Sequence, residues 1–196
     1  LESVERIEIL AGGGSTLYGS TASGGIVNIV TREKGFSKVG LAIGSFGGKK
    51  GSAGISGKSG KVKMTAGAQW ERSDGHSPGT DLQTEGIDGS GSWRSGRWHI
   101  RWNAGMMQRH FGARGFYGSY PSFEEVTAVQ AGVNGLCVLN DRSMVRMRAG
   151  SRGHRDIFTL IRDQPDYYRN THFNRSSVVG GDYFRLIPNG RSFTLG

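Results

Sequence analysis

Residues 1–33 read LESVERIEILAGGGSTLYGSTASGGIVNIVTRE, and this stretch decides the fold. Val4, Ile7 and Ile9 suit one buried strand, and the continuous apolar run Ile26–Val30 suits a second. Because glycine adopts backbone conformations that are closed to other residues, the glycines between the two runs permit a hinge and a sharp reversal. The hinge residues that we predict are Gly12, Gly13, Gly14, Gly24 and Gly25.

The same glycines do not form a phosphate-binding loop. Neither the G-x-G-x-x-G spacing nor the G-x-x-x-x-G-K-[ST] spacing is present. Between the glycine clusters, Ser15–Gly19 suits a short helical turn with Ser15 as its N-cap. The segment therefore predicts two strands joined through small-residue turns, and not a nucleotide site.

From residue 34 onward the sequence alternates with a period of two. In residues 61–72 the even positions are small or apolar, such as Val62, Met64 and Trp70, whereas the odd positions are polar or glycine. Since successive side chains of a strand point to opposite faces, each such segment has one apolar face and one polar face. The pattern predicts about nine strands, the last of them cut, over residues 38–45, 51–57, 61–72, 85–94, 97–109, 126–138, 142–156, 171–187 and from 191.

The connections between these strands alternate in length. Short, Gly-, Asn- or Asp-containing turns fall at 58–60, 95–96, 140–141 and 188–190. Longer loops fall at 73–84, 110–124 and 157–170, with a shorter one near 46–50. The strands of about 10–13 residues suit a tilted membrane crossing. Outer-membrane barrels have short periplasmic turns and long extracellular loops, so the pattern favours a barrel. A soluble all-β protein remains an alternative because its solvated sheet face has the same chemistry.

Composition and charge narrow the class of protein. The chain has 34 glycines, 4 prolines and 35% hydrophobic residues, which is little for a compact soluble core of 196 residues. The net charge of +9 is spread over many strands, which argues against nucleic-acid binding. Cys137 is the single cysteine, so no intrachain disulfide is expected. The sequence contains no run of 18 or more apolar residues, so no transmembrane helix is expected. No signal peptide is visible, and the chain looks like an excerpt.

The stretches VERIEIL at 4–10, GGGSTLYG at 12–19 and GGIVNIVT at 24–31 resemble the last third of the plug domain of TonB-dependent outer-membrane receptors. The family pattern reads approximately VERIEVLRGP, SALYG, GG and INIIT, whereas this chain has Ala11 and Gly13 at the Arg and Pro positions. The loop 111–125, FGARGFYGSYPSFEE, is similar to a loop of cobalamin-type and related receptors. The resemblance implies the C-terminal part of an α+β plug over 1–33, followed over 34–196 by the first strands of a partial transmembrane antiparallel β-barrel. The whole barrel would then have roughly 22 strands.

The resemblance also implies a function. It implies an outer-membrane receptor of bacteria that binds a scarce nutrient, an iron–siderophore or cobalamin, and imports it with energy from the proton gradient. The implied partners are TonB with its inner-membrane energising complex, outer-membrane lipid and a large nutrient ligand. No enzymatic activity and no cofactor are expected, because no catalytic or histidine-ligand spacing is present. A passive porin-like channel and a soluble β-rich binding or adhesion domain are the alternatives.

The candidate site residues lie in the long loops. Flat aromatic rings with polar tips suit a large, partly apolar ligand, although self-packing of an ordered loop would require the same residues. Carboxylates in the same loops form ordinary solvated surface or gather a calcium ion, for which the candidates are Asp74 and Asp81. The candidate ligand contacts are Phe116, Tyr117, Tyr120, Tyr167 and Tyr168.

Overall fold

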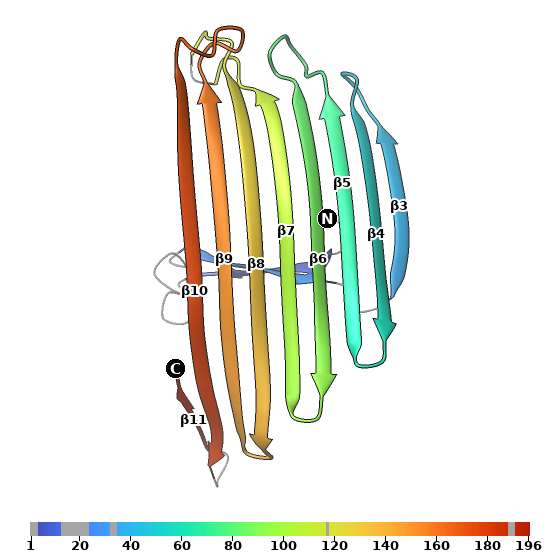
Figure 1. Cartoon of the computed structure of the whole chain (residues 1–196), viewed down its shortest axis with the longest axis vertical. Helices are drawn as coiled ribbons and strands as arrows, with labels where there is room; N and C mark the ends of the chain where they lie inside the picture. The colour runs from blue at the N-terminus through green and yellow to red at the C-terminus, as the bar shows by residue number, and fades with distance from the viewer. Residues whose placement is uncertain (1–3, 13–23, 32–34, 117, 188–190) are drawn as a thin grey trace.

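The computed structural model describes residues 4–12, 24–31, 35–116, 118–187 and 191–196. These residues form eleven antiparallel strands in two sheets (Figure 1). The smaller sheet pairs β1 with β2, and the larger places nine strands in chain order from β3 to β11. The bounds are β1 Val4–Ala11, β2 Gly25–Thr31, β3 Phe36–Ile43, β4 Lys49–Ser59, β5 Val62–Ser73, β6 Leu82–Ser95, β7 Trp98–Gly112, β8 Phe123–Asn140, β9 Ser143–Thr159, β10 Arg169–Ile187 and β11 Arg191–Leu195.

The nine strands predicted from residue 34 onward are confirmed, and the fold class is all-β, as expected. Most of the strands are longer than the alternation indicated: β8 begins at Phe123 and not at residue 126, and β10 contains 19 residues. The reason is that polar residues at the upper strand ends continue the hydrogen-bonded ladder, for example where Glu125 pairs with Ile157. The loops predicted at 73–84, 110–124 and 157–170 are correspondingly shorter, at 74–81, 113–122 and 160–168, whereas the β3–β4 connection keeps its predicted length and lies at 44–48.

The large sheet has one apolar and one polar face, as the alternation predicted. One row of paired residues runs through Met64, Gly91, Trp102, Val133 and Ala149. Val133 is 43% exposed and Val179, which pairs with Ala149, is 84% exposed. In the described residues this apolar face is uncovered by protein, so it is the face that lipid would cover.

The adjoining row lies on the opposite face and is polar. It runs through Lys63, Ser92, Arg101, Asn134 and Arg148. The β1–β2 hairpin lies on this side of the sheet, because a single cavity is lined by Asn28 and Val30 of the hairpin together with Lys63 and Arg101. The polar face is therefore the inner wall of the partial barrel.

The two ends of the large sheet differ in their connections (Figure 1). At one end, two-residue turns follow β4, β6 and β8. Gly60 and Gly96 adopt φ values of +55° and +53° there, which favour glycine, and the Asn140 side chain accepts a hydrogen bond from the Arg142 N–H at 3.0 Å. At the other end, longer loops span 44–48, 74–81, 113–122 and 160–168. The alternation of connection lengths is thus present among the described residues, and the turn predicted at 188–190 lies outside them.

The β1–β2 hairpin pairs Ile7 with Ile29 and Ala11 with Gly25. Gly25 has a φ of +143°, and a Cβ there would lie 2.7 Å from the Leu10 carbonyl oxygen, so glycine is required. Hydrogen bonds from the side chains of Asn28 and then Arg6, each 2.7 Å long, lower the pKa of the Glu8 carboxyl below its usual 4.5. Because this pKa is lowered in the folded hairpin, the associated stabilisation is present above pH 4.5 and is lost as the pH falls.

Parts of the N-terminal prediction fall outside the described residues. Gly13, Gly14 and the Ser15–Gly19 turn lie in the interval 13–23, and the boundary placed after residue 33 lies in the interval 32–34. Gly12, Gly24 and Gly25 are described, and Gly12 adopts a φ of +106°. The division into a plug part and a barrel part therefore stays a prediction. The described residues contain no helix long and apolar enough to cross a membrane.

Candidate functional site

The long loops at one end of the sheet contact one another, and Arg162 is the residue that joins three of them. Its Nη1 lies 2.7 Å from the Oδ1 of Asp81, and its backbone N–H donates to the Pro121 carbonyl oxygen at 3.0 Å. Its guanidinium carbon lies 4.1 Å from the centre of the Phe123 ring, a cation–π contact. The Arg162 side chain thus links the 160–168 loop to the 74–81 loop and to the first residue of β8, and its backbone links the same loop to the 113–122 loop.

Backbone hydrogen bonds strengthen the same assembly. The Gly112 N–H donates to the Asp81 carbonyl oxygen at 2.8 Å, and the Ala113 N–H donates to the Ser122 carbonyl oxygen at 2.8 Å. The Ser122 hydroxyl donates to the Ala113 carbonyl oxygen at 2.9 Å, and Ser122 is only 2% exposed. The base of the 113–122 loop is therefore closed by its own hydrogen bonds and fixed to its neighbour.

The β3–β4 connection joins this assembly through Phe46. Phe46 has a φ of +56°, a strained value for an aromatic residue. Its carbonyl oxygen accepts the Asp74 N–H at 2.8 Å, and its ring makes an edge contact with the His76 ring at a centroid distance of 6.5 Å. These contacts to the 74–81 loop account for the retention of the strained conformation. All four described long loops are thereby connected.

The predicted ligand-contacting aromatics lie in two of these loops. Phe116 is 79% exposed, and Tyr120 and Tyr167 are also exposed. Tyr168 is exposed too but makes an edge contact with the Phe158 ring at 6.2 Å, so it takes part in packing of the loop. Tyr117 lies outside the described residues. No bound ligand tests these assignments, and they stay predictions.

A cavity of about 460 Å³ opens at the base of the 113–122 loop. It is lined by the rings of Phe111, Phe116 and His76, by Arg114, and by the buried carboxylate of Glu124. The Arg114 backbone N–H donates to the Gly79 carbonyl oxygen at 3.2 Å, which ties this part of the 113–122 loop to the 74–81 loop. Rings and charges of both signs in one cavity suit a polar aromatic molecule.

The two calcium candidates have cationic neighbours. Asp81 pairs with Arg162, and the Oδ1 of Asp74 lies 3.8 Å from the Nη2 of Arg72. Among the described residues no group of three or more His, Cys, Asp or Glu side chains could hold a metal ion. These ion pairs give both carboxylates a role without a metal, and calcium binding stays a prediction. Sequence reasoning missed Arg162, because nothing in its local sequence indicates contacts with residues 40 and 80 positions away.

No protein-family model matches the chain. The iron-regulated outer membrane virulence protein of Vibrio cholerae is 58% identical over 33 residues, which are 17% of this chain and 5% of that protein. Three solved structures match nearly the whole chain at low identity. The ferric-catecholate import receptor Fiu of E. coli, in its open form, has a TM-score of 0.67 and 14% identity over 93% of this chain and 36% of its own.

Two further structures come from Acinetobacter baumannii. The siderophore receptor PiuA has a TM-score of 0.71 and 12% identity over 96% of this chain and 33% of its own. The ferric preacinetobactin receptor BauA has the same TM-score and identity over 93% of this chain and 32% of its own. The chain thus spans about a third of the length of these receptors. The resemblance to a segment of a TonB-dependent receptor is confirmed at the level of the fold.

Proposed function

We propose that this chain is a segment of a bacterial outer-membrane receptor that binds a ferric siderophore outside the cell and imports it. The observation that carries the proposal is the connected set of long loops at one end of an open sheet with an apolar outer face and a polar inner wall. Exposed aromatic side chains and the cavity beside Arg114 lie in this set. Such a surface suits a large, charged, partly aromatic ligand.

The comparisons favour iron over cobalamin as the nutrient. Fiu is named as a ferric-catecholate import receptor, PiuA as a siderophore receptor, and the Vibrio relative as iron-regulated. No name among these relatives mentions a corrinoid. These neighbours are transport receptors and not enzymes, in agreement with the non-enzymatic function that the sequence predicted.

We further propose that import depends on TonB and its inner-membrane energising complex, and that outer-membrane lipid covers the apolar face. In support of an energised mechanism, the β1–β2 hairpin lies against the inner wall, where it would obstruct the lumen. The exposed valines and methionines of the outer face support contact with lipid, because a barrel in lipid must direct its apolar side chains outward.

Uptake of radioactive iron tests this function. Cells that carry the full-length receptor, and cells from which its gene is deleted, are grown under iron limitation and given ⁵⁵Fe bound to a catecholate siderophore. We expect cell-associated iron to accumulate only with the receptor, and a protonophore to abolish accumulation while surface binding persists. Equal accumulation in both strains would contradict import, and accumulation that resists the protonophore would contradict energy coupling.

A further inference from the structure

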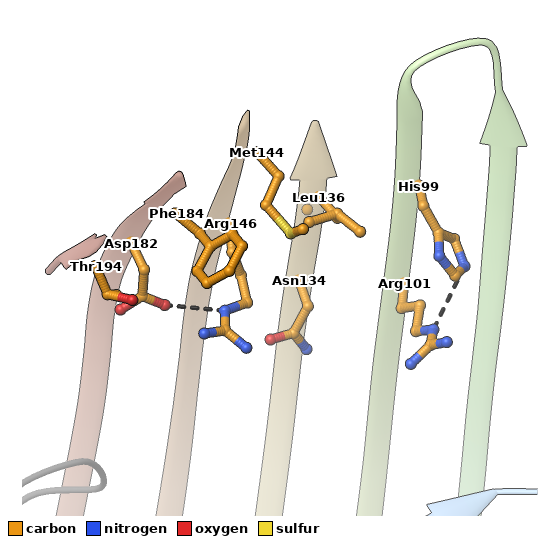
Figure 2. Close-up of a pocket in the computed structure, with 10 residues that line it drawn as sticks. His99, Arg101, Asn134, Leu136, Met144, Arg146, Asp182, Phe184 and Thr194 are labelled. Carbon is orange, nitrogen blue, oxygen red and sulfur yellow. Dashed lines mark hydrogen bonds and ion pairs between the residues drawn. The ribbon is translucent and has the colours of Figure 1, made fainter. Parts of the chain in front are cut away.

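A second cavity lies on the inner wall near the short turns, at the opposite end from the ligand loops (Figure 2). Its volume is about 440 Å³, within the range of small-molecule sites. Side chains from β7, β8, β9, β10 and β11 converge on it from one face of the sheet. Its lining side chains include Arg101, Asn134, Leu136, Met144, Arg146 and Phe184.

The polar part of this cavity is basic. Arg101 and Arg146 line it, and the only carboxylate among its lining residues is Asp182, whose Oδ2 accepts a 2.9 Å bond from the Arg146 Nε. Asn134 is in register with Arg101 and lines the cavity beside it, whereas the guanidinium of Arg148 lies over Gly180 on β10 and does not line the cavity. Arg94 also reaches into this region, where its Nη2 lies 3.4 Å from the His99 ring. Several cations thus surround a single, already paired carboxylate.

An excess of cationic side chains on this part of the inner wall favours the binding of an anion. Guanidinium groups bind carboxylate and other oxyanions through paired, charge-assisted hydrogen bonds, and an amide can donate a further one. The remaining lining is apolar, with Leu136, Met144 and the ring of Phe184 on the same cavity. A ligand that satisfies both parts has an anionic oxygen group on an aromatic or aliphatic body.

We propose that this cavity binds a small organic anion with an apolar body, of the catecholate or aryl-carboxylate class. Arg101 and Arg146 hold the oxygen atoms, Asn134 donates a further hydrogen bond, and Phe184 with Met144 contacts the body. We identify this anion as a group of the imported siderophore, bound on the exit side of the lumen. This identification rests on the proposed function. The binding of the anion itself does not rest on it.

Thiol labelling of the full-length receptor tests the site. In a Cys137→Ser background, Met144→Cys places one reactive thiol in the cavity, and Thr194→Cys provides a second, independent reporter there. Each receptor is labelled with N-ethylmaleimide, with and without 2,3-dihydroxybenzoate as the probe anion. We expect the probe to slow labelling and its uncharged analogue catechol not to do so. We expect Arg101→Gln with Arg146→Gln to weaken the apparent affinity for the probe about tenfold or more.

Matched controls identify the source of any protection. Val145→Cys lies next in sequence to Met144, on the opposite face of β9, and its labelling should not respond to the probe. Arg155→Gln, on the same strand as Arg146 and on the outer face, should leave the protection unchanged. Protection that survives the loss of both inner arginines would overturn the proposal.

Two further outcomes would also overturn it. If neither thiol is labelled in the absence of the probe, another part of the protein occupies the cavity. If both are labelled at the same rate with and without the probe, the cavity does not bind the anion. If the wild-type receptor fails to take up iron but the probe still protects the cavity thiols from labelling, the proposed function is refuted and the anion site is still supported.

Discussion

Val133→Lys should destabilise the full-length receptor in lipid by about 2–4 kcal/mol, the cost of a cation near the midplane of an outer face. Val133 lies in the middle of the apolar rows, between Trp102 on β7 and Ala149 on β9, and nothing described covers it. A lysine there would have to lose water in contact with lipid, and no partner carboxylate is in register with it. The measurement is the free energy of unfolding in vesicles, from urea titration of folded and unfolded receptor.

The matched variant is Gln130→Lys, three residues earlier on β8 and on the inner wall. Its ammonium would remain in the polar lumen, where water screens its repulsion from Arg152, the residue in register with it on β9, so we expect a loss of less than about 1 kcal/mol. Lys63, already present on that wall, shows that the inner face accepts a cation. Equal losses in the two variants would contradict the assignment of the apolar face to lipid.

Arg162→Ala should weaken binding of the ferric siderophore to the cell surface about tenfold, equivalent to about 1.4 kcal/mol. The change removes the ion pair to Asp81 and the contact with the Phe123 ring, each worth about 0.5–1 kcal/mol at a half-exposed site. The backbone hydrogen bonds between the loops remain, but the 160–168 loop is held less firmly to the 74–81 loop, and its ordering on binding opposes affinity. The measurement is the dissociation constant for the ferric complex on intact cells.

Two controls separate positioning from general destabilisation. Arg169→Ala removes a longer, 3.7 Å contact with Glu125, which reaches from β10 to β8 across β9, and should leave the affinity nearly unchanged. The charge exchange Asp81→Arg with Arg162→Asp restores the ion pair without the original ring contact and should recover part of the affinity. Unchanged affinity in Arg162→Ala would show that the loops do not act through this residue.

The strands of the large sheet could be predicted from the sequence because their alternation is a local property. A lysine at 63 and a methionine at 64 must point to opposite faces of any strand, whatever the neighbours are. Turn glycines such as Gly60 and Gly96 likewise report a conformation that one residue determines. The strand ends were less predictable, since polar residues such as Glu125 extend the ladder without an apolar signal.

The contacts between loops could not be predicted, because they depend on register over long separations. Arg162 contacts Asp81 across 81 positions, and local sequence does not distinguish it from other loop arginines. The cavity beside Arg101 depends on five strands being in the register observed, so that Arg101, Asn134 and Arg146 line the same wall. The aromatic loop residues could be proposed from composition alone, but their roles could not.

The most direct test of the account is the side of the membrane on which the two ends of the sheet lie. A short epitope is inserted into the full-length receptor, either between Asp163 and Gln164 in the 160–168 loop or between Asp141 and Arg142 in the β8–β9 turn. We expect antibody to bind the loop epitope on intact cells, and the turn epitope only after the outer membrane is permeabilised. A turn epitope that is accessible on intact cells, or a loop epitope that is not, would contradict an outer-membrane receptor with its ligand loops outside.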